Sequence, residues 1–149
     1  MSQQTAPAPT VNRAELTVLV VDDHERLRND VVQQLRALGF SRIDTASTSA
    51  AAEEKMATHQ YDIIFLDWVM PGRSGLALMQ ACREQRAFDH IAFVMVTSQT
   101  DERRMVEALK AGATAYIIKP LIPESFRSSV QAVISWVARS NPRFKSAPA

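Results

Sequence analysis

The sequence predicts an α/β fold in which five parallel strands form one doubly wound sheet with helices on both faces. Short apolar runs recur along the chain, and each is followed by a segment whose apolar residues repeat at helical spacing. A run of four to six apolar residues is too short for a usual helix and is typical of a strand buried on both faces. Because strand and helix alternate five times, each connection is expected to be a right-handed crossover between parallel strands.

Polar and turn-forming residues bound the predicted strands. The clearest case is the run 63–66, because Asp62 precedes it and Pro71-Gly72 follows it. The expected strands are residues 16–21, 42–46, 63–66, 91–96 and 115–118.

The predicted helices begin where side chains can cap a helix N-terminus. Asp23, Ser74 and either Thr48 or Ser49 are suitable caps. The fourth helix is expected to face the core with three residues, Met105, Ala108 and Leu109. The expected helices span about residues 23–38, 48–59, 74–85, 101–111 and 123–138.

Composition indicates a globular protein and excludes several kinds of site. The formal net charge of +1 gives no reason to expect nucleic acid or an anionic membrane as a partner. The single cysteine, Cys82, cannot form an internal disulfide. The histidines His24, His59 and His90 lie far apart in the sequence, so we interpret them as surface or capping residues rather than metal ligands.

One domain is expected over residues 15–139, with disordered tails at 1–14 and 140–149. The basic residues Arg139, Arg143 and Lys145 are interpreted as a solvated end of the chain. The N-terminus lacks the features of a secretory signal, and no apolar run approaches the ~20 residues that a membrane span needs. We therefore expect a cytoplasmic protein without membrane insertion.

Polar side chains follow four of the five predicted strands. Asp22 and Asp23 follow the first strand, Asp67 the third, Thr97 the fourth and Lys119 the fifth. Because the carboxyl ends of parallel strands share one edge, these side chains should lie together. Three carboxylates repel one another, and oxygen ligands favour a hard cation such as Mg²⁺. Phosphoryl transfer needs such a set, with Asp67 as the nucleophile.

Each of these residues also has a simpler interpretation. Asp22 or Asp23 alone could be a helix cap, Thr97 a strand-end residue and Lys119 a solvated charge. Their coincidence at separate strand ends favours a functional site.

This set of residues resembles the receiver domain of two-component response regulators. The resemblance covers about residues 16–138 and rests on Asp22-Asp23, Asp67 with the turn Met70-Pro71-Gly72, Thr97, and Lys119-Pro120. Trp68 and Tyr116 are most similar to the single-domain, CheY-like chemotaxis receivers. The resemblance implies a flavodoxin-like fold with strand order 2-1-3-4-5 and five helices.

The resemblance also implies how the site works. Asp67 would accept a phosphoryl group from a phosphohistidine on a sensor histidine kinase or a phosphotransfer protein. Mg²⁺ would be bound by Asp23 directly, by Asp22 mostly through water, by Asp67, and by the Val69 backbone carbonyl.

The implied switch involves residues around the phosphoryl group. Lys119, after which the peptide bond to Pro120 would be cis, would contact that group, and Thr97 would move toward it. Tyr116 would turn inward and alter the face of the fourth helix, fifth strand and fifth helix, where an effector protein would dock.

Two positions that tune the phosphate lifetime in receivers differ in their chemistry here. Val69 cannot orient an attacking water, whereas Gln99 could, so the lifetime stays open. Ser74 replaces an acidic residue common in the family, and its hydroxyl can still cap a helix.

Other functions remain open at this point. Few residues follow Ala138, so output is expected from docking to another protein, although a receiver cut from a larger regulator is an alternative. A Mg²⁺-dependent aspartyl phosphohydrolase is disfavoured by Val69, because such enzymes usually carry a second acid there. A third reading is an adaptor that works without phosphorylation.

Overall fold

The computed structural model describes residues 11–98 and 102–144. Its five parallel strands form a single sheet in the order β2-β1-β3-β4-β5, which confirms the order implied by the resemblance. Each strand agrees with its predicted range to within one residue at either end. The strands are β1 (Thr17–Val21), β2 (Arg42–Ala46), β3 (Ile63–Leu66), β4 (Ala92–Thr97) and β5 (Ala115–Ile118).

Helices connect the strands and confirm the predicted alternation. Within the described residues they are α1 (Glu25–Ala37), α2 (Ser49–Thr58), α3 (Gly75–Arg83), α4 (Glu102–Ala111) and α5 (Pro123–Ser140). Thr48 and Ser74 cap α2 and α3, because their side chains accept hydrogen bonds from backbone N–H groups inside the first turn. Three short 3₁₀ helices were not predicted: η1 (Arg13–Glu15), η2 (Arg86–Phe88) and η3 (Pro142–Phe144).

The predicted cap of the first helix is wrong. His24, not Asp23, occupies the N-cap position of α1, and its side chain makes no capping hydrogen bond. The Asp22 carboxylate accepts a hydrogen bond from the His24 backbone N–H at 2.9 Å. The helix therefore starts one residue later than the Asp23 prediction requires, and both aspartates lie outside it.

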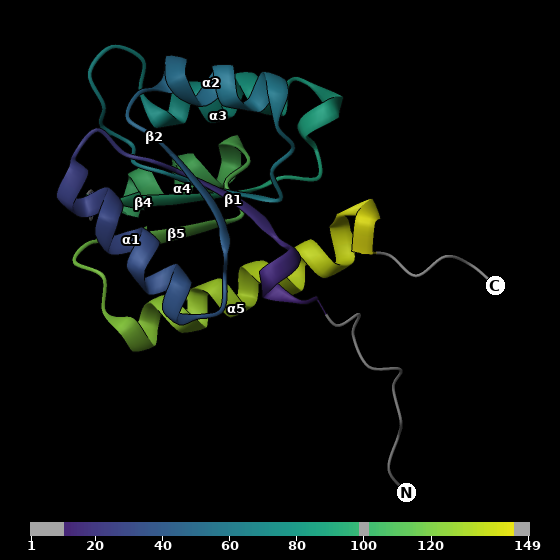
Figure 1. Cartoon of the computed structure of the whole chain (residues 1–149). Coiled ribbons are helices and arrows are strands. Elements are labelled where there is room, and N and C mark those ends of the chain that lie inside the picture. Colours follow the sequence, from purple (N-terminus) through teal and green to yellow (C-terminus); the bar gives the residue numbers. More distant parts are fainter. Residues whose placement is uncertain (1–10, 99–101, 145–149) are drawn as a thin grey trace, which may run out of the picture.

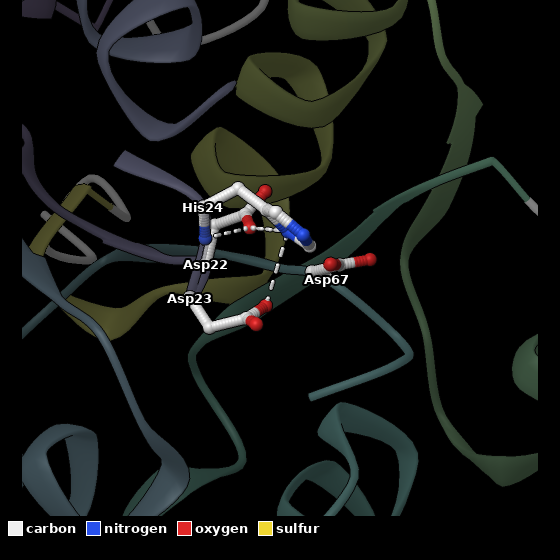
Figure 2. Close-up of side chains that lie close together, drawn as sticks. All are labelled: Asp22, Asp23, His24 and Asp67. Atoms are coloured by element: carbon white, nitrogen blue, oxygen red, sulfur yellow. Dashed lines mark hydrogen bonds and ion pairs between the residues drawn. The ribbon is translucent and has the colours of Figure 1, made fainter. Parts of the chain in front are cut away.

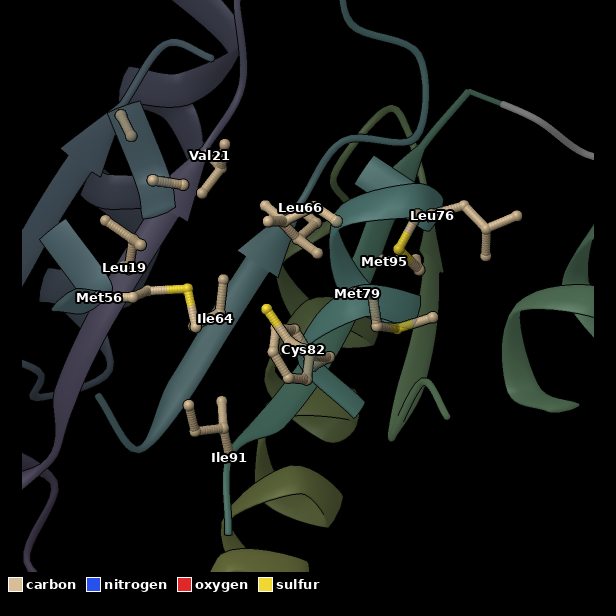
Figure 3. Packing of buried hydrophobic residues seen from close by; sticks show 14 of the residues in the cluster. Leu19, Val21, Met56, Ile64, Leu66, Leu76, Met79, Cys82, Ile91 and Met95 are labelled. Atoms are coloured by element: carbon tan, nitrogen blue, oxygen red, sulfur yellow. The ribbon is translucent and has the colours of Figure 1, made fainter. Parts of the chain in front are cut away.

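Helices cover both faces of the sheet (Figure 1). The sheet separates two hydrophobic cores. Alternate residues of each central strand point to opposite faces, as in any pleated strand. Leu19, Ile64 and Phe93 belong to the core under α2, α3 and α4, part of which is drawn in Figure 3. Val18 and Ile63 belong to the core under α1 and α5. Because both faces of the sheet are covered, the polar ends of the strands are where chemistry can reach solvent.

Helix α4 packs differently from its predicted orientation. Ala108 is fully buried and Met105 half-buried, but Leu109 is 45% exposed. Residues 108 and 109 are about 100° apart around the helix, so only one of them can face the core fully. The predicted start at Asp101 lies outside the described residues.

The two ends of the described chain are joined by a buried charge. The Asp62 side chain, only 2% exposed, accepts hydrogen bonds on its two oxygens from the Arg143 guanidinium at 2.9 and 2.8 Å. It also accepts hydrogen bonds from Asn141 Nδ2 and from the backbone N–H of Thr17, both at 2.9 Å. Arg143 further donates to the backbone carbonyl of Glu15 at 3.3 Å. Asp62 and Thr17 lie at the amino edge of the sheet.

This contact bears on the predicted tails. Residues 11–14 and 140–144 fall in ranges expected to be disordered, yet η3 packs on the domain and Arg13 donates to the Leu38 carbonyl at 2.8 Å. The interpretation of Arg143 as a solvated charge is wrong, because its guanidinium, although 44% of the side chain is exposed, pairs with the buried Asp62 carboxylate at 2.8 Å. Lys145 lies outside the described residues. In the part of the chain that is described, no helix is long and apolar enough to span a bilayer.

Candidate functional site

The acceptor candidate Asp67 sits directly after the buried strand β3. Its backbone N–H donates to the Val21 carbonyl at 3.0 Å, so the strand pairing with β1 continues up to the aspartate. The side chain is 8% exposed. Burial raises the pKa of Asp67, and the nearby charges of Asp22 and Asp23 raise it further, while the Lys119 ammonium and the Trp68 backbone N–H act in the opposite direction. An anionic Asp67 therefore needs additional positive charge.

The turn after Asp67 is held close to the acceptor by Gly75. The Gly75 backbone N–H donates to the Trp68 carbonyl at 2.9 Å. A Cβ atom at position 75 would lie 2.0 Å from the Asp67 backbone oxygen, which no side chain could tolerate. Gly72, in the same turn, has a φ of +80°, a conformation that glycine adopts readily.

Two more carboxylates face Asp67 from the end of β1 (Figure 2). The Asp22 backbone N–H donates to the Ala46 carbonyl at 3.1 Å, which fixes the residue at the sheet edge. Its side chain is 4% exposed, and that of Asp23 is 22% exposed. The Oδ1 atom of Asp23 is buried and has no hydrogen-bond partner within the described residues. Buried carboxylate oxygens are normally paired, so this atom is a suitable ligand for a cation.

Lys119 reaches the same cluster from the end of β5. Its Nζ atom lies 2.8 Å from Asp22 Oδ2 and 3.7 Å from Asp67 Oδ2. The shorter distance pairs the ammonium mainly with Asp22 and keeps it within reach of Asp67. The Lys119 backbone N–H donates to the Thr97 carbonyl at 2.9 Å, and the following peptide bond to Pro120 is cis, as the resemblance implied.

The remaining predicted residues surround this cluster. Thr97, at the end of β4, is buried, and Tyr116 on β5 is half-buried. The Tyr116 ring meets the edge of the Trp68 ring, with 6.4 Å between centroids. The Arg104 guanidinium of α4 lies over the Trp68 ring, 5.5 Å from the ring centroid. Tyr116 therefore contacts Trp68, which is the residue next to Asp67 in the sequence.

Val69 is 55% exposed at the rim of the site. A cleft of about 490 Å³ opens there and gives solvent access to Asp67 and Lys119. Its lining residues are His24, Leu27, Asp67, Val69, Ser98, Lys119 and Pro120. Gln99, the other position expected to tune the phosphate lifetime, lies outside the described residues.

The sequence reasoning missed His24 as a neighbour of the site. Its Nδ1 atom lies 3.4 Å from Asp22 Oδ1 and 3.3 Å from Asp23 Oδ1. The separation of the three histidines from one another gives no sign of this contact, whereas the adjacency of His24 to two aspartates at a strand end does.

The structure thus brings the carboxylates, the ammonium and the threonine to one edge. One ligand atom from each of Asp22, Asp23, His24 and Asp67 lies within 4.8 Å of the others. Three carboxylates and one ammonium leave a formal charge of −2, which a divalent cation would balance. Fold and site together define a doubly wound α/β domain with an acidic cluster able to hold a divalent ion at its carboxyl edge.

Comparison with known proteins identifies the family within this class. Residues 18–131 match the family model described as response regulator receiver domain. The chain therefore belongs to the response regulator receiver domain family.

Chemotaxis proteins are among its relatives. The chain is 28% identical over 122 residues to the chemotaxis protein CheY of Pseudomonas aeruginosa, covering 82% of this chain and 98% of that one. It is 31% identical over 120 residues to CheY1 of Helicobacter pylori, covering 80% and 97% respectively.

Solved structures agree with the sequence relatives. The chemotaxis response regulator CheY4 of Vibrio cholerae superposes with a TM-score of 0.73 at 30% identity, covering 79% of this chain and 98% of that one. The CheX-CheY-BeF₃-Mg complex from Borrelia burgdorferi matches with a TM-score of 0.74 at 28% identity, covering 80% and 89%.

Proposed function

We propose that this chain is a phosphorylation-controlled binding module rather than an enzyme with a diffusible substrate. Asp67 accepts a phosphoryl group from the phosphohistidine of a sensor histidine kinase or a phosphotransfer protein, and the modified domain changes its affinity for a partner protein. The observation that carries the proposal is the placement of Lys119 Nζ 3.7 Å from Asp67 Oδ2, beside two further carboxylates and an open cleft.

The chemical step follows from the positions of these groups. A carboxylate oxygen of Asp67 forms the new P–O bond while the P–N bond to the donor imidazole breaks. The Lys119 ammonium, already in the cluster, can follow the added negative charge and contact the phosphoryl oxygens. Thr97 supplies a hydroxyl donor from the neighbouring strand end.

Mg²⁺ is the cofactor that the cluster fits best. Asp23, Asp22 and Asp67 provide carboxylate oxygens, with the Val69 carbonyl as a further oxygen ligand. When bound, Mg²⁺ supplies the positive charge that stabilises an anionic Asp67 and the phosphoryl oxygens. The buried Asp23 Oδ1 atom, which has no hydrogen-bond partner among the residues that the structure describes, supports this assignment.

Docking of an effector is proposed on the face of α4, β5 and the start of α5. Large apolar side chains are unusually exposed there, and they are Val106 at 42%, Leu109 at 45%, Ile118 at 43% and Ile122 at 60%. Exposed apolar side chains that gather on one face are typical of a protein interaction site. Tyr116, on β5 and in contact with Trp68, connects this face to the acceptor.

Phosphorylation is expected to change the affinity for the partner protein in a graded way rather than completely. A hydrogen bond from Thr97 to a charged phosphoryl group contributes about 1.5–3 kcal/mol. Reversing a 1:99 ratio of two conformations needs about 5.5 kcal/mol, so Lys119 and the partner must supply the remaining free energy.

The test is to incubate the protein with Mg²⁺ and acetyl phosphate and to measure its intact mass. We expect a gain of one phosphoryl group that is stable in acid and labile in base. The gain should vanish in Asp67→Asn and persist in the control Asp89→Asn, which removes an exposed carboxylate elsewhere. An undiminished gain in Asp67→Asn would place the acceptor on another residue.

A further inference from the structure

The His24 imidazole lies in the acidic cluster, and the proposed function gives it no role. Its side chain is 62% exposed and projects from the N-cap position of α1 toward the two aspartates that follow β1 (Figure 2). The Nδ1 atom lies 3.4 Å from Asp22 Oδ1 and 3.3 Å from Asp23 Oδ1. The other oxygen of Asp22 is paired with Lys119 at 2.8 Å, while Oδ1 faces the imidazole and also accepts a hydrogen bond from the His24 backbone N–H at 2.9 Å.

This arrangement requires a hydrogen atom or a metal ion between the imidazole nitrogen and the two carboxylate oxygens. A neutral imidazole with its proton on Nε2 presents a lone pair at Nδ1. That lone pair would be repelled by two carboxylate oxygens, one of which, Asp23 Oδ1, is buried without a hydrogen-bond partner in the described part of the chain. Either a proton on Nδ1 or a bound metal ion removes the repulsion.

The distances from His24 Nδ1 to the two carboxylate oxygens suit a metal ion. Ligands that bind Zn²⁺ at about 2.0–2.1 Å in tetrahedral directions are about 3.3–3.4 Å from one another. The observed separations of 3.4 and 3.3 Å equal this spacing. Asp67 offers a fourth ligand, because one of its oxygens lies within 4.8 Å of a ligand atom from each of the other three residues.

We propose that His24 Nδ1 makes this cluster a site for a first-row transition ion such as Zn²⁺, in addition to the Mg²⁺ of the proposed function, whose aspartates it shares. Imidazole is a preferred ligand of Zn²⁺, Ni²⁺ and Cu²⁺, whereas Mg²⁺ is bound through oxygen. His24 therefore sets which metals the site accepts and adds little to the binding of Mg²⁺.

The test compares two metals in three proteins. Calorimetric titrations with ZnCl₂ and with MgCl₂ are made on the wild type, on His24→Ala and on the control His59→Ala, which removes an exposed imidazole outside the cluster. The His24 side chain makes no capping hydrogen bond, so alanine removes no such bond from α1. We expect His24→Ala to weaken Zn²⁺ binding by about tenfold or more. Binding of Mg²⁺ should change by less than about twofold in the same variant, because oxygen ligands hold that ion.

A second measurement reports on the imidazole itself. In protein labelled with ¹⁵N-histidine, the Nδ1 resonance of His24 should shift to the position of a metal-bound nitrogen when Zn²⁺ is added and change much less with Mg²⁺. Equal losses for both metals in His24→Ala, no loss of Zn²⁺ affinity, or an equal loss in His59→Ala would each overturn the proposal. A wild type that binds Mg²⁺ normally in those cases leaves the proposed function intact, whereas a wild type that binds neither metal contradicts both.

Discussion

Replacing Arg143 by alanine should destabilise the fold even though this residue lies near the end of the chain. Arg143→Ala removes the guanidinium that hydrogen-bonds both oxygens of Asp62, a carboxylate that is only 2% exposed. Asp62 would keep the hydrogen bonds from Thr17 and Asn141 but lose its charged partner. A buried charge is then left incompletely paired.

The magnitude follows from the environment of the two groups. Breaking a fully buried ion pair costs about 3–5 kcal/mol, while an exposed pair contributes about 0–1 kcal/mol. The Arg143 side chain is 44% exposed, so solvent screens part of the interaction. We expect a loss of about 2 kcal/mol in the free energy of unfolding.

Urea denaturation at neutral pH measures this loss directly. Arg139→Ala is the matched control, because that arginine is exposed in the last turn of α5, four residues earlier, and it should change stability by less than about 0.5 kcal/mol. Combining Arg143→Ala with Asp62→Asn in a double-mutant cycle should give a coupling energy that accounts for most of the effect. Equal stabilities of Arg143→Ala and the control would refute the pairing.

Three further perturbations concern the site. Gly75→Ala should cost about 3 kcal/mol or more in urea denaturation and reduce phosphorylation, because its Cβ would lie 2.0 Å from the Asp67 carbonyl oxygen; a fully stable variant would contradict the close packing. Asp67→Asn should be more stable than the wild type by about 1 kcal/mol in EDTA at neutral pH. Burial raises the pKa of Asp67, so the stability that its proton provides is present at low pH and lost as the pH rises through the raised value, and the advantage of the variant should disappear in acid. Arg104→Ala should shift the Trp68 fluorescence and cost about 0.5–1 kcal/mol, since the guanidinium lies 5.5 Å from that ring; an unchanged spectrum would show that this contact does not form in solution.

Periodicity and turn chemistry were sufficient to predict most of the fold. The apolar run 63–66 is buried on both faces, and the caps Thr48 and Ser74 hold the helices that follow them. These features depend on residues close in sequence. The exposure of Leu109 was not predicted, because a helical repeat defines a stripe of apolar residues but does not decide which edge of that stripe meets the sheet.

The candidate site was predictable for a different reason. Parallel strands must end at one edge, so residues that follow separate strands are brought together by topology alone. The partnership of Arg143 with Asp62 has no comparable signal, because neither residue follows a pattern that points to the other. Likewise, the contact of His24 with both aspartates depends on where α1 begins, which was misplaced by one residue.

The position of the buried Asp62–Arg143 ion pair also has a practical use for anyone attaching a dye, an affinity tag or a sensor surface to this domain. Glu15 and Arg143 are in contact near the amino end of β3, whereas Asp67 follows the carboxyl end of the same strand. At about 3.3 Å per residue, the five steps from Asp62 to Asp67 separate the two by about 16 Å. A probe coupled near Glu15 or Arg143 would thus leave the cleft at Asp67 unobstructed.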